Sequence, residues 1–157
     1  MRSLRQRTAQ AGMTLLELVI ACSILMVLAS AAVPLARMTV KRQREAELRR
    51  ALREIRTAID RYKDAADRNL IRVEVGTEGY PPDLDTLVKG VQVGPSGDRR
   101  LRFLRRIPTD PIIGRADWGL RAVQDDSDST SWGGKNVFDV YSRSTGTALD
   151  GTRYSDW

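Results

Sequence analysis

The feature that most constrains the fold is an apolar stretch near the N-terminus, residues 18–36, which contains no charged side chain. At roughly 1.5 Å per residue, a helix of about 19 residues extends about 28 Å. The hydrocarbon core of a bilayer is about 30 Å thick, and a helix satisfies its backbone hydrogen bonds internally. The stretch therefore predicts one membrane-spanning helix, with the remainder of the chain outside the bilayer.

A single carboxylate, Glu17, lies at the head of this stretch, five residues after Gly12. A charged side chain at membrane depth costs roughly 3 kcal/mol unless it is paired. No basic residue lies close to Glu17 in the uncut sequence, but cleavage between Gly12 and Met13 would create an α-amine one helical turn away. A cleavable secretory signal places its apolar region before the cut, so the stretch here would survive processing as an anchor.

This N-terminus resembles that of type IV pilins and type II secretion pseudopilins. The shared features are a short basic leader that ends at Gly12, an apolar Met13 after the cut, Glu17 as the fifth residue after it and Pro34 as the twenty-second. The resemblance implies that a prepilin peptidase cleaves after Gly12 and that the Met13 amine is methylated. It also implies that Glu17 meets the terminal amine of a neighbouring subunit in a helical polymer. An ordinary signal anchor is the disfavoured alternative, because its carboxylate would stay unpaired.

Pro34 lies late in the apolar helix, where it removes one backbone hydrogen bond and favours a kink or local melting. The resemblance implies a hinge that lets subunits pack in a filament, and this reading is favoured over a proline that the membrane helix merely tolerates.

Basic residues flank the anchor on both sides. A plain count of positive charge would leave the C-terminal part in the cytoplasm, whereas the resemblance requires the leader there. We adopt the second orientation because the first flank usually dominates. The residues counted are Arg2, Arg5 and Arg7 before the anchor, and Arg37, Lys41, Arg42 and Arg44 after it.

Composition excludes several classes of function. The net charge of +6 falls to about +3 after cleavage, because three of the 26 basic residues leave with the leader while all 20 acidic residues remain. A nucleic-acid partner is therefore not expected. Histidine is absent and the single cysteine, Cys22, lies in the anchor, so an enzyme is not expected either. Many type IV pilins have a C-terminal disulfide loop, whereas the major, G-type pseudopilins generally lack one. In this respect the chain resembles the G-type pseudopilins.

Residues 37–69 contain no glycine or proline and predict an amphipathic helix continuous with the anchor. Its charged residues are typical of a solvated face. Its apolar residues recur at alternating spacings of three and four and form one stripe that needs a partner surface. They are Leu48, Leu52, Ile55, Ile59, Tyr62 and Ala66.

The remainder predicts a loop and short helix over residues 70–100 and a C-terminal sheet and loop over residues 101–157. Asp83 can cap the short helix and Gly90 can end it, while residues 94–100 are expected to be a loop. Strands are expected over residues 118–123 and 138–142, separated by a polar surface loop over residues 124–135. Residues 80–82, 108–111 and 138–142 resemble segments of G-type pseudopilins. The expected fold is α+β and pilin-like, with a leader (1–12), a transmembrane assembly helix (13–36) and a soluble domain (37–157) in which the helix packs on a small antiparallel sheet.

The C-terminal segment, residues 142–157, is where the resemblance implies a calcium site built from aspartates and backbone carbonyls. Calcium takes about six to eight oxygen ligands. The candidate ligands are the side chains of Asp150 and Asp156 and the carbonyl of Ser142, but Thr145 replaces an aspartate expected from the family, and two arginines add positive charge. The preferred alternative is a loop held by hydrogen bonds, with a turn at Asp150 and Trp157 as a hydrophobic plug.

The function implied is that of a structural subunit of a type II secretion pseudopilus, which helps to drive protein export across the outer membrane. The alternative is a major or minor subunit of a type IV pilus-like filament for adhesion, motility or DNA uptake. Implied partners are further copies or other pseudopilins, a prepilin peptidase and an inner-membrane assembly platform. The implied location is the bacterial inner membrane, crossed once, with the C-terminal domain in the periplasm and then in a filament.

Overall fold

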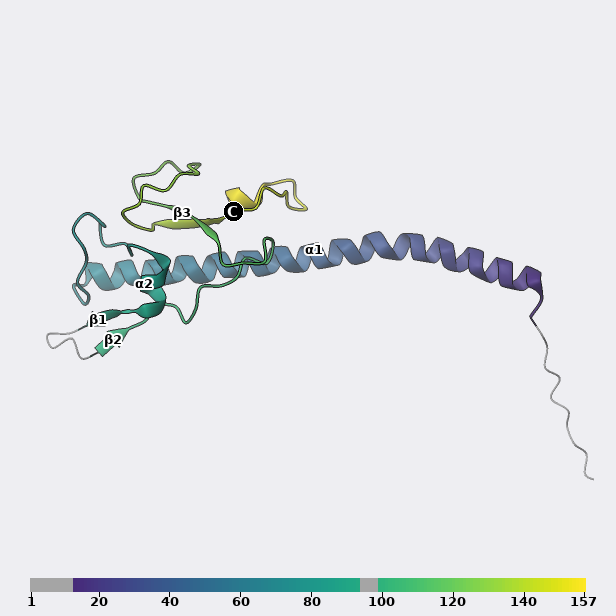
Figure 1. The fold of residues 1–157 in the computed structure, drawn as a ribbon, viewed down its shortest axis with the longest axis horizontal. Coiled ribbons are helices and arrows are strands. Elements are labelled where there is room, and N and C mark those ends of the chain that lie inside the picture. Colours follow the sequence, from purple (N-terminus) through teal and green to yellow (C-terminus); the bar gives the residue numbers. More distant parts are fainter. Residues whose placement is uncertain (1–12, 94–98) are drawn as a thin grey trace, which may run out of the picture. The chain divides into compact units, whose positions relative to one another are not determined.

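The computed structural model describes residues 13–93 and 99–157, apart from the side chains at positions 31 and 34. The described elements are α1 (Leu15–Asp67), α2 (Leu84–Lys89), β1 (Val91–Val93), β2 (Arg99–Leu101), β3 (Trp118–Arg121), β4 (Asp139–Ser142) and a 3-10 turn η1 (Tyr154–Asp156) (Figure 1). The chain divides into two compact units, Met1–Val40 and Lys41–Trp157. The expected α+β class is confirmed: a long N-terminal helix packs on small antiparallel sheets.

The helix α1 is 53 residues long and confirms the prediction that the anchor and the amphipathic helix form one continuous element. Its interior after Pro34 contains neither glycine nor proline. It ends where Asn69 takes a left-handed conformation, φ 54°, and the Leu70 amide donates to the carbonyl of Ala65. Such a closure satisfies carbonyls that a helix leaves unpaired at its C-terminus.

The helix α1 continues through Pro34. Because proline has no N–H, the Ser30 carbonyl receives no donor from position 34. The hinge expected at this position stays a prediction.

The core of the second unit forms along the predicted apolar stripe of α1. Leu48, Leu52, Ile55 and Ile59 are at most 2% exposed, and the stripe is buried throughout. The remainder of the chain contributes the partners that cover it: Ile71, Leu84, Leu87, Leu104, Trp118, Val137, Val140, Ala148 and Tyr154. Burying a side chain of this size contributes about 1.5–3 kcal/mol, so the stripe holds the second unit together.

The short helix α2 follows its predicted boundaries. Asp83 caps it, with Oδ1 accepting from the Thr86 amide at 2.6 Å, and Gly90 ends it with φ 77°. A side chain at Gly90 would overlap the carbonyl of Leu101, so glycine is needed both for its backbone angle and for space.

The sheet prediction needs correction, because the strands form two separate antiparallel pairs. β1 pairs with β2, placing Val91 opposite Leu101, although residues 99 and 100 were assigned to a loop. The hairpin escapes prediction because β2 reads Arg-Arg-Leu and is exposed throughout, so it carries no apolar alternation. The second pair, β3 with β4, has the expected strands but shorter ends.

In the β3–β4 pair, Gly119 lies opposite Tyr141 and leaves space for the tyrosine ring. A Cβ at position 119 would overlap that ring. The Arg121 guanidinium lies 4.3 Å from the centre of the same ring, on the same strand as Gly119. The pair therefore depends on one small residue and one aromatic residue directly across from each other.

Candidate functional site

The first described turn of α1 is built by Thr14 and Glu17. The Glu17 amide donates to Oγ1 of Thr14 at 3.2 Å, and the Leu18 amide donates to the Thr14 carbonyl at 3.1 Å. Threonine followed three residues later by glutamate is the spacing of a capping box, in which the first hydroxyl pairs an amide that the helix leaves free. The sequence prediction missed Thr14 as a cap, although this spacing could have revealed it.

Glu17 is exposed, and it is the only charged residue from Met13 to Ala36. Its position in the first turn is favourable, because the N-terminus of a helix carries a partial positive charge. No ion pair involves Glu17 within residues 13–93 and 99–157. The Glu17 carboxylate is therefore exposed on the surface of the first turn of α1.

The other polar side chains of this part of α1 bond to their own helix. Ser23 Oγ donates to the Val19 carbonyl at 2.7 Å, and Ser30 Oγ donates to the Val27 carbonyl at 2.7 Å. Hydroxyls that bond backward in this way can enter an apolar environment with their hydrogen bonds made. Glu17 is therefore the group in this segment that most needs a partner from elsewhere.

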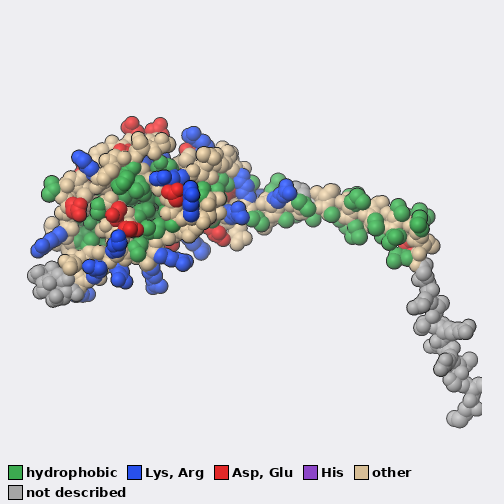
Figure 2. Space-filling view, in the orientation of Figure 1, with side chains coloured by type: hydrophobic (Ala, Val, Ile, Leu, Met, Phe, Trp, Pro, Cys, Tyr) green, Lys and Arg blue, Asp and Glu red, His purple; other side chains and the backbone are tan. Residues whose placement is uncertain are grey.

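The apolar side chains around this part of α1 are uncovered, as Figure 2 shows in green. Leu15 is 81% exposed, Met26 is 72% exposed, and none of the most apolar part of the helix is buried. By length and composition the helix can cross a membrane. An apolar surface of this extent needs lipid or other protein to cover it.

Residues 7–33 match a known family model, the prokaryotic N-terminal methylation motif. The motif indicates a pilin-like filament subunit. It supports a type IV pilin-like or pseudopilin family, and it implies processing by a prepilin peptidase and membrane-associated assembly. Neither the curated proteins nor the solved structures gave a match.

The predicted site residues of the N-terminus lie at the start of this motif and along its helix. Gly12 lies outside the described residues, and Met13 is exposed directly before the cap formed by Thr14. Glu17 and Pro34 are about four to five helical turns apart on α1, so the two residues do not belong to one site. Cleavage, methylation and assembly at these residues stay predictions.

The C-terminal loop is fixed to α1 by side chains that the sequence prediction did not single out. Glu45 Oε1 accepts from the Leu149 amide at 2.9 Å and from the Tyr154 hydroxyl at 3.0 Å, and Lys41 Nζ donates to the Thr147 carbonyl at 2.7 Å. Burial, followed by the bond to Glu45, raises the pKa of Tyr154 to about 12. These contacts are made by the helix side chains that the pattern assigned to a solvated face.

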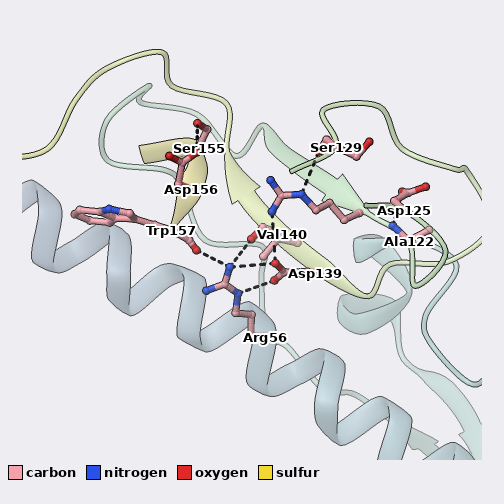
Figure 3. Close-up of polar contacts among 10 residues, drawn as sticks. Arg56, Ala122, Asp125, Ser129, Asp139, Val140, Ser155, Asp156 and Trp157 are labelled. Atoms are coloured by element: carbon pink, nitrogen blue, oxygen red, sulfur yellow. Dashed lines mark hydrogen bonds and ion pairs between the residues drawn. The ribbon is translucent and has the colours of Figure 1, made fainter. Parts of the chain in front are cut away.

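Arg56 makes the same kind of link to β4 (Figure 3). Its guanidinium donates to Asp139 Oδ1 at 2.6 Å, to the Val140 carbonyl at 3.1 Å and to the Trp157 main-chain oxygen at 2.6 Å. One side chain of α1 therefore holds both the strand and the end of the loop. Charge-assisted bonds of this type are stronger than neutral ones.

The candidate calcium ligands each bond to a different partner. Ser142 Oγ donates to Asp110 Oδ2 at 2.6 Å, and Asp156 Oδ2 accepts from Arg153 at 3.1 Å. Asp150 Oδ1 accepts from the Thr152 hydroxyl at 2.6 Å, which, with the Thr152 amide, is the main reason that the pKa of Asp150 is lowered. Within the described residues, no group of three or more acidic, histidine or cysteine side chains could hold a metal ion. Calcium binding at these residues stays a prediction.

Trp157 packs edge-on against Tyr154, with ring centres 5.2 Å apart, and the Arg49 guanidinium lies 4.1 Å from its ring centre. The turn at Asp150 is closed by Gly151, whose φ is 88° and whose amide donates to the Ala148 carbonyl. This arrangement agrees with the preferred alternative, a loop held by hydrogen bonds and closed by an aromatic plug.

Proposed function

We propose that this chain is a structural subunit of a type II secretion pseudopilus that polymerises through its N-terminal helix to help drive protein export across the outer membrane. The observation that carries the proposal is Glu17: one exposed carboxylate at the capped start of an otherwise apolar, uncovered helix, inside a match to the N-terminal methylation motif. Lipid covers the helix before assembly, and neighbouring helices cover it afterwards.

Processing supplies the charge that Glu17 needs. Cleavage between Gly12 and Met13 leaves a cationic amine at Met13, and methylation keeps that amine basic. In a polymer, Glu17 of one subunit pairs with this amine of the next, which offsets the cost of placing both charges in an apolar interior. The subunit enters assembly from the inner membrane, with residues 37–157 in the periplasm.

The choice of a pseudopilus over a type IV pilus rests on the C-terminal part. The single cysteine excludes an intrachain disulfide loop, and the loop is instead held by Glu45 and Arg56. A type IV pilus-like filament for adhesion, motility or DNA uptake is the alternative, and the two differ in where the polymer accumulates. Loss of exported proteins in a deletion strain supports the first, and surface filaments at native expression support the second.

The test uses the full chain, expressed with the assembly machinery of its own genome. Mass spectrometry of the N-terminus is expected to find methylated Met13 as the first residue. Glu17→Gln removes only the charge, so membrane insertion should persist while the yield of sheared filaments falls at least about tenfold. Ser23→Ala is the matched control, because the Ser23 hydroxyl bonds only to its own helix. Wild-type assembly of Glu17→Gln, or filaments whose subunits still begin at residue 1, would overturn the mechanism.

A further inference from the structure

The second unit carries a strongly basic groove that the fold itself does not use. It measures about 550 Å³ and lies between α1 and residues 103–105, with Phe103 and Leu104 on one wall. Its charged lining consists of Arg50, Arg53, Arg61 and Arg105 around a single carboxylate, Glu54. Four guanidiniums and one carboxylate leave a local excess of positive charge, which favours an acidic partner.

These four arginines are exposed, and none forms an ion pair within residues 13–93 and 99–157. Their neighbours on α1 behave differently, because Arg49 pairs with Asp150 and Arg56 pairs with Asp139. The arginines on one edge of the helix therefore pair with the C-terminal part of the chain, whereas the arginines of the groove can still pair with acidic groups of a partner.

Exposed acidic side chains lie on the segment between β3 and β4. Asp126 and Asp128 are exposed there, and Gln124 Nε2 donates to Glu78 Oε1 at 2.8 Å, which places a third carboxylate against the start of the segment. Within the described parts of the chain these three carboxylates form no ion pair. Trp132 of the same segment is 39% exposed, which adds an aromatic surface.

The acidic segment has a defined shape. Asp125 Oδ2 accepts from the Ala122 amide at 2.7 Å and from the Gly133 amide at 3.0 Å, which ties its two ends together. The Ser129 amide donates to the Asp126 carbonyl at 2.9 Å. Little ordering of this segment would then be required on binding.

The two charged surfaces lie on different sides of the second unit. Helical spacing places Arg50, Glu54 and Arg61 along the edge of α1 that faces residues 103–105, whereas Glu45, Arg49 and Arg56 line the opposite edge, beside β4 and the C-terminal loop. The acidic segment lies on the β4 side, because Arg121, which pairs with Asp139 of β4, also donates to the Ser129 carbonyl. One copy therefore cannot satisfy its own groove with its own acidic segment.

We propose that the acidic segment of one copy, with Asp126, Asp128 and Glu78, docks in the arginine groove of the next copy. A contact between two different surfaces is heterologous and repeats into an open helical array, whereas a self-complementary contact would stop at a dimer. Arginine also stacks well on aromatic rings, so Trp132 can join the contact. This inference rests on the proposed function, since it assigns a second contact between subunits of the same filament.

The test reverses charge on each surface of the full chain under the assembly conditions described above. Arg53→Glu with Arg61→Glu, and separately Asp126→Lys with Asp128→Lys, are each expected to lower filament yield about tenfold, because attraction becomes repulsion at every subunit boundary. Mixing or combining the two changes should restore assembly, since the charges are complementary again. Arg68→Glu, directly after the end of α1, lies outside the groove and is the control. Thermal unfolding of each solubilised variant checks that the fold persists.

The outcomes separate this inference from the proposed function. If Glu17→Gln blocks assembly while both reversed variants polymerise normally, the docking contact is wrong and the filament function stands. If reversal lowers yield but the combined variant stays defective, the groove serves another acidic partner, such as an exported protein or a nucleic acid, and the docking contact is again wrong. If the wild-type chain forms no filament with its machinery, both proposals fall together.

Discussion

The Tyr154 hydroxyl donates to Oε1 of Glu45 at 3.0 Å, and the same oxygen accepts the Leu149 amide at 2.9 Å. One carboxylate of α1 therefore holds two points of the C-terminal loop. Replacing Glu45 with alanine should lower the free energy of unfolding by about 1–3 kcal/mol, because a largely buried hydroxyl and an amide lose their acceptor. Urea titration of the detergent-solubilised full chain, followed by tryptophan fluorescence, measures the loss.

Glu47→Ala is the matched control for that change, since Glu47 is exposed and accepts only from Gln43, one turn away on the same helix. Its effect should stay within about 0.5 kcal/mol of wild type. Equal losses for the two variants would contradict a specific role of Glu45.

The raised pKa of Tyr154 predicts a pH dependence at alkaline pH. The unfolded tyrosine ionises near pH 10.0, whereas the folded one ionises near pH 12, so the stabilising contribution is complete below pH 10 and is lost as pH rises towards 12. The difference in stability between wild type and Tyr154→Phe should therefore shrink across this range by up to about 2 kcal/mol. A difference that stays constant from pH 9 to pH 12 would show that Tyr154 is not coupled to folding in this way.

Asp110 and Ser142 are both fully buried, and their side chains are joined by a hydrogen bond of 2.6 Å. Asp110 Oδ1 also accepts from the Ile112 amide, so Asp110→Ala should cost more than Ser142→Ala, with losses of about 3 and 1 kcal/mol respectively. The double variant should be less destabilised than the sum of the two, because both single changes remove the same bond. Strict additivity in chemical denaturation would refute that coupling.

The close approach of Gly119 and Tyr141 predicts that a larger residue at position 119 destabilises the fold, and that removing the tyrosine ring reverses the effect. Gly119→Ala places a methyl group where the ring of Tyr141 lies and should cost about 1–3 kcal/mol. Tyr141→Ser removes the ring and should make the alanine at position 119 nearly neutral in that background. The measurement is the shift in Tm of the two single variants and the double variant relative to wild type, and the absence of rescue would place the strain elsewhere.

Calcium gives a simple test of the C-terminal loop. Because Asp150 and Asp156 bond to neighbouring residues, we expect excess calcium or its removal by EGTA to leave Tm unchanged. A ligand that binds only the folded state must raise Tm as its concentration rises. A rise that Asp150→Asn abolishes would establish a calcium site and reverse this expectation.

The helices were predictable because their signals are local. The apolar spacing from Leu48 to Ala66 marks the buried face of α1, and Asp83 and Gly90 mark the ends of α2. The strands β3 and β4 were recognisable from their apolar residues. The hairpin of β1 and β2 was not, because backbone pairing sets its structure and its second strand contains two exposed arginines.

The links that hold the C-terminal loop were not predictable for a different reason. Lys41, Glu45 and Arg56 look like members of a solvated helical face, and nothing local distinguishes them from Arg50 or Arg53. Their roles depend on segments about a hundred residues away, which only the tertiary fold brings close. The cap formed by Thr14 was within reach of sequence reasoning, since its spacing to Glu17 is a known signature.

The uncovered first part of α1 limits how a subunit can travel. Each large aliphatic side chain moved into water costs about 1.5–3 kcal/mol, and Leu15, Leu16, Ile20, Leu25 and Leu28 are only some of those concerned. A solitary subunit dissolved in water would be strongly disfavoured for that reason. In the proposed assembly, the helix would therefore have to pass directly from the bilayer to the neighbouring helices, without being exposed to water between the two.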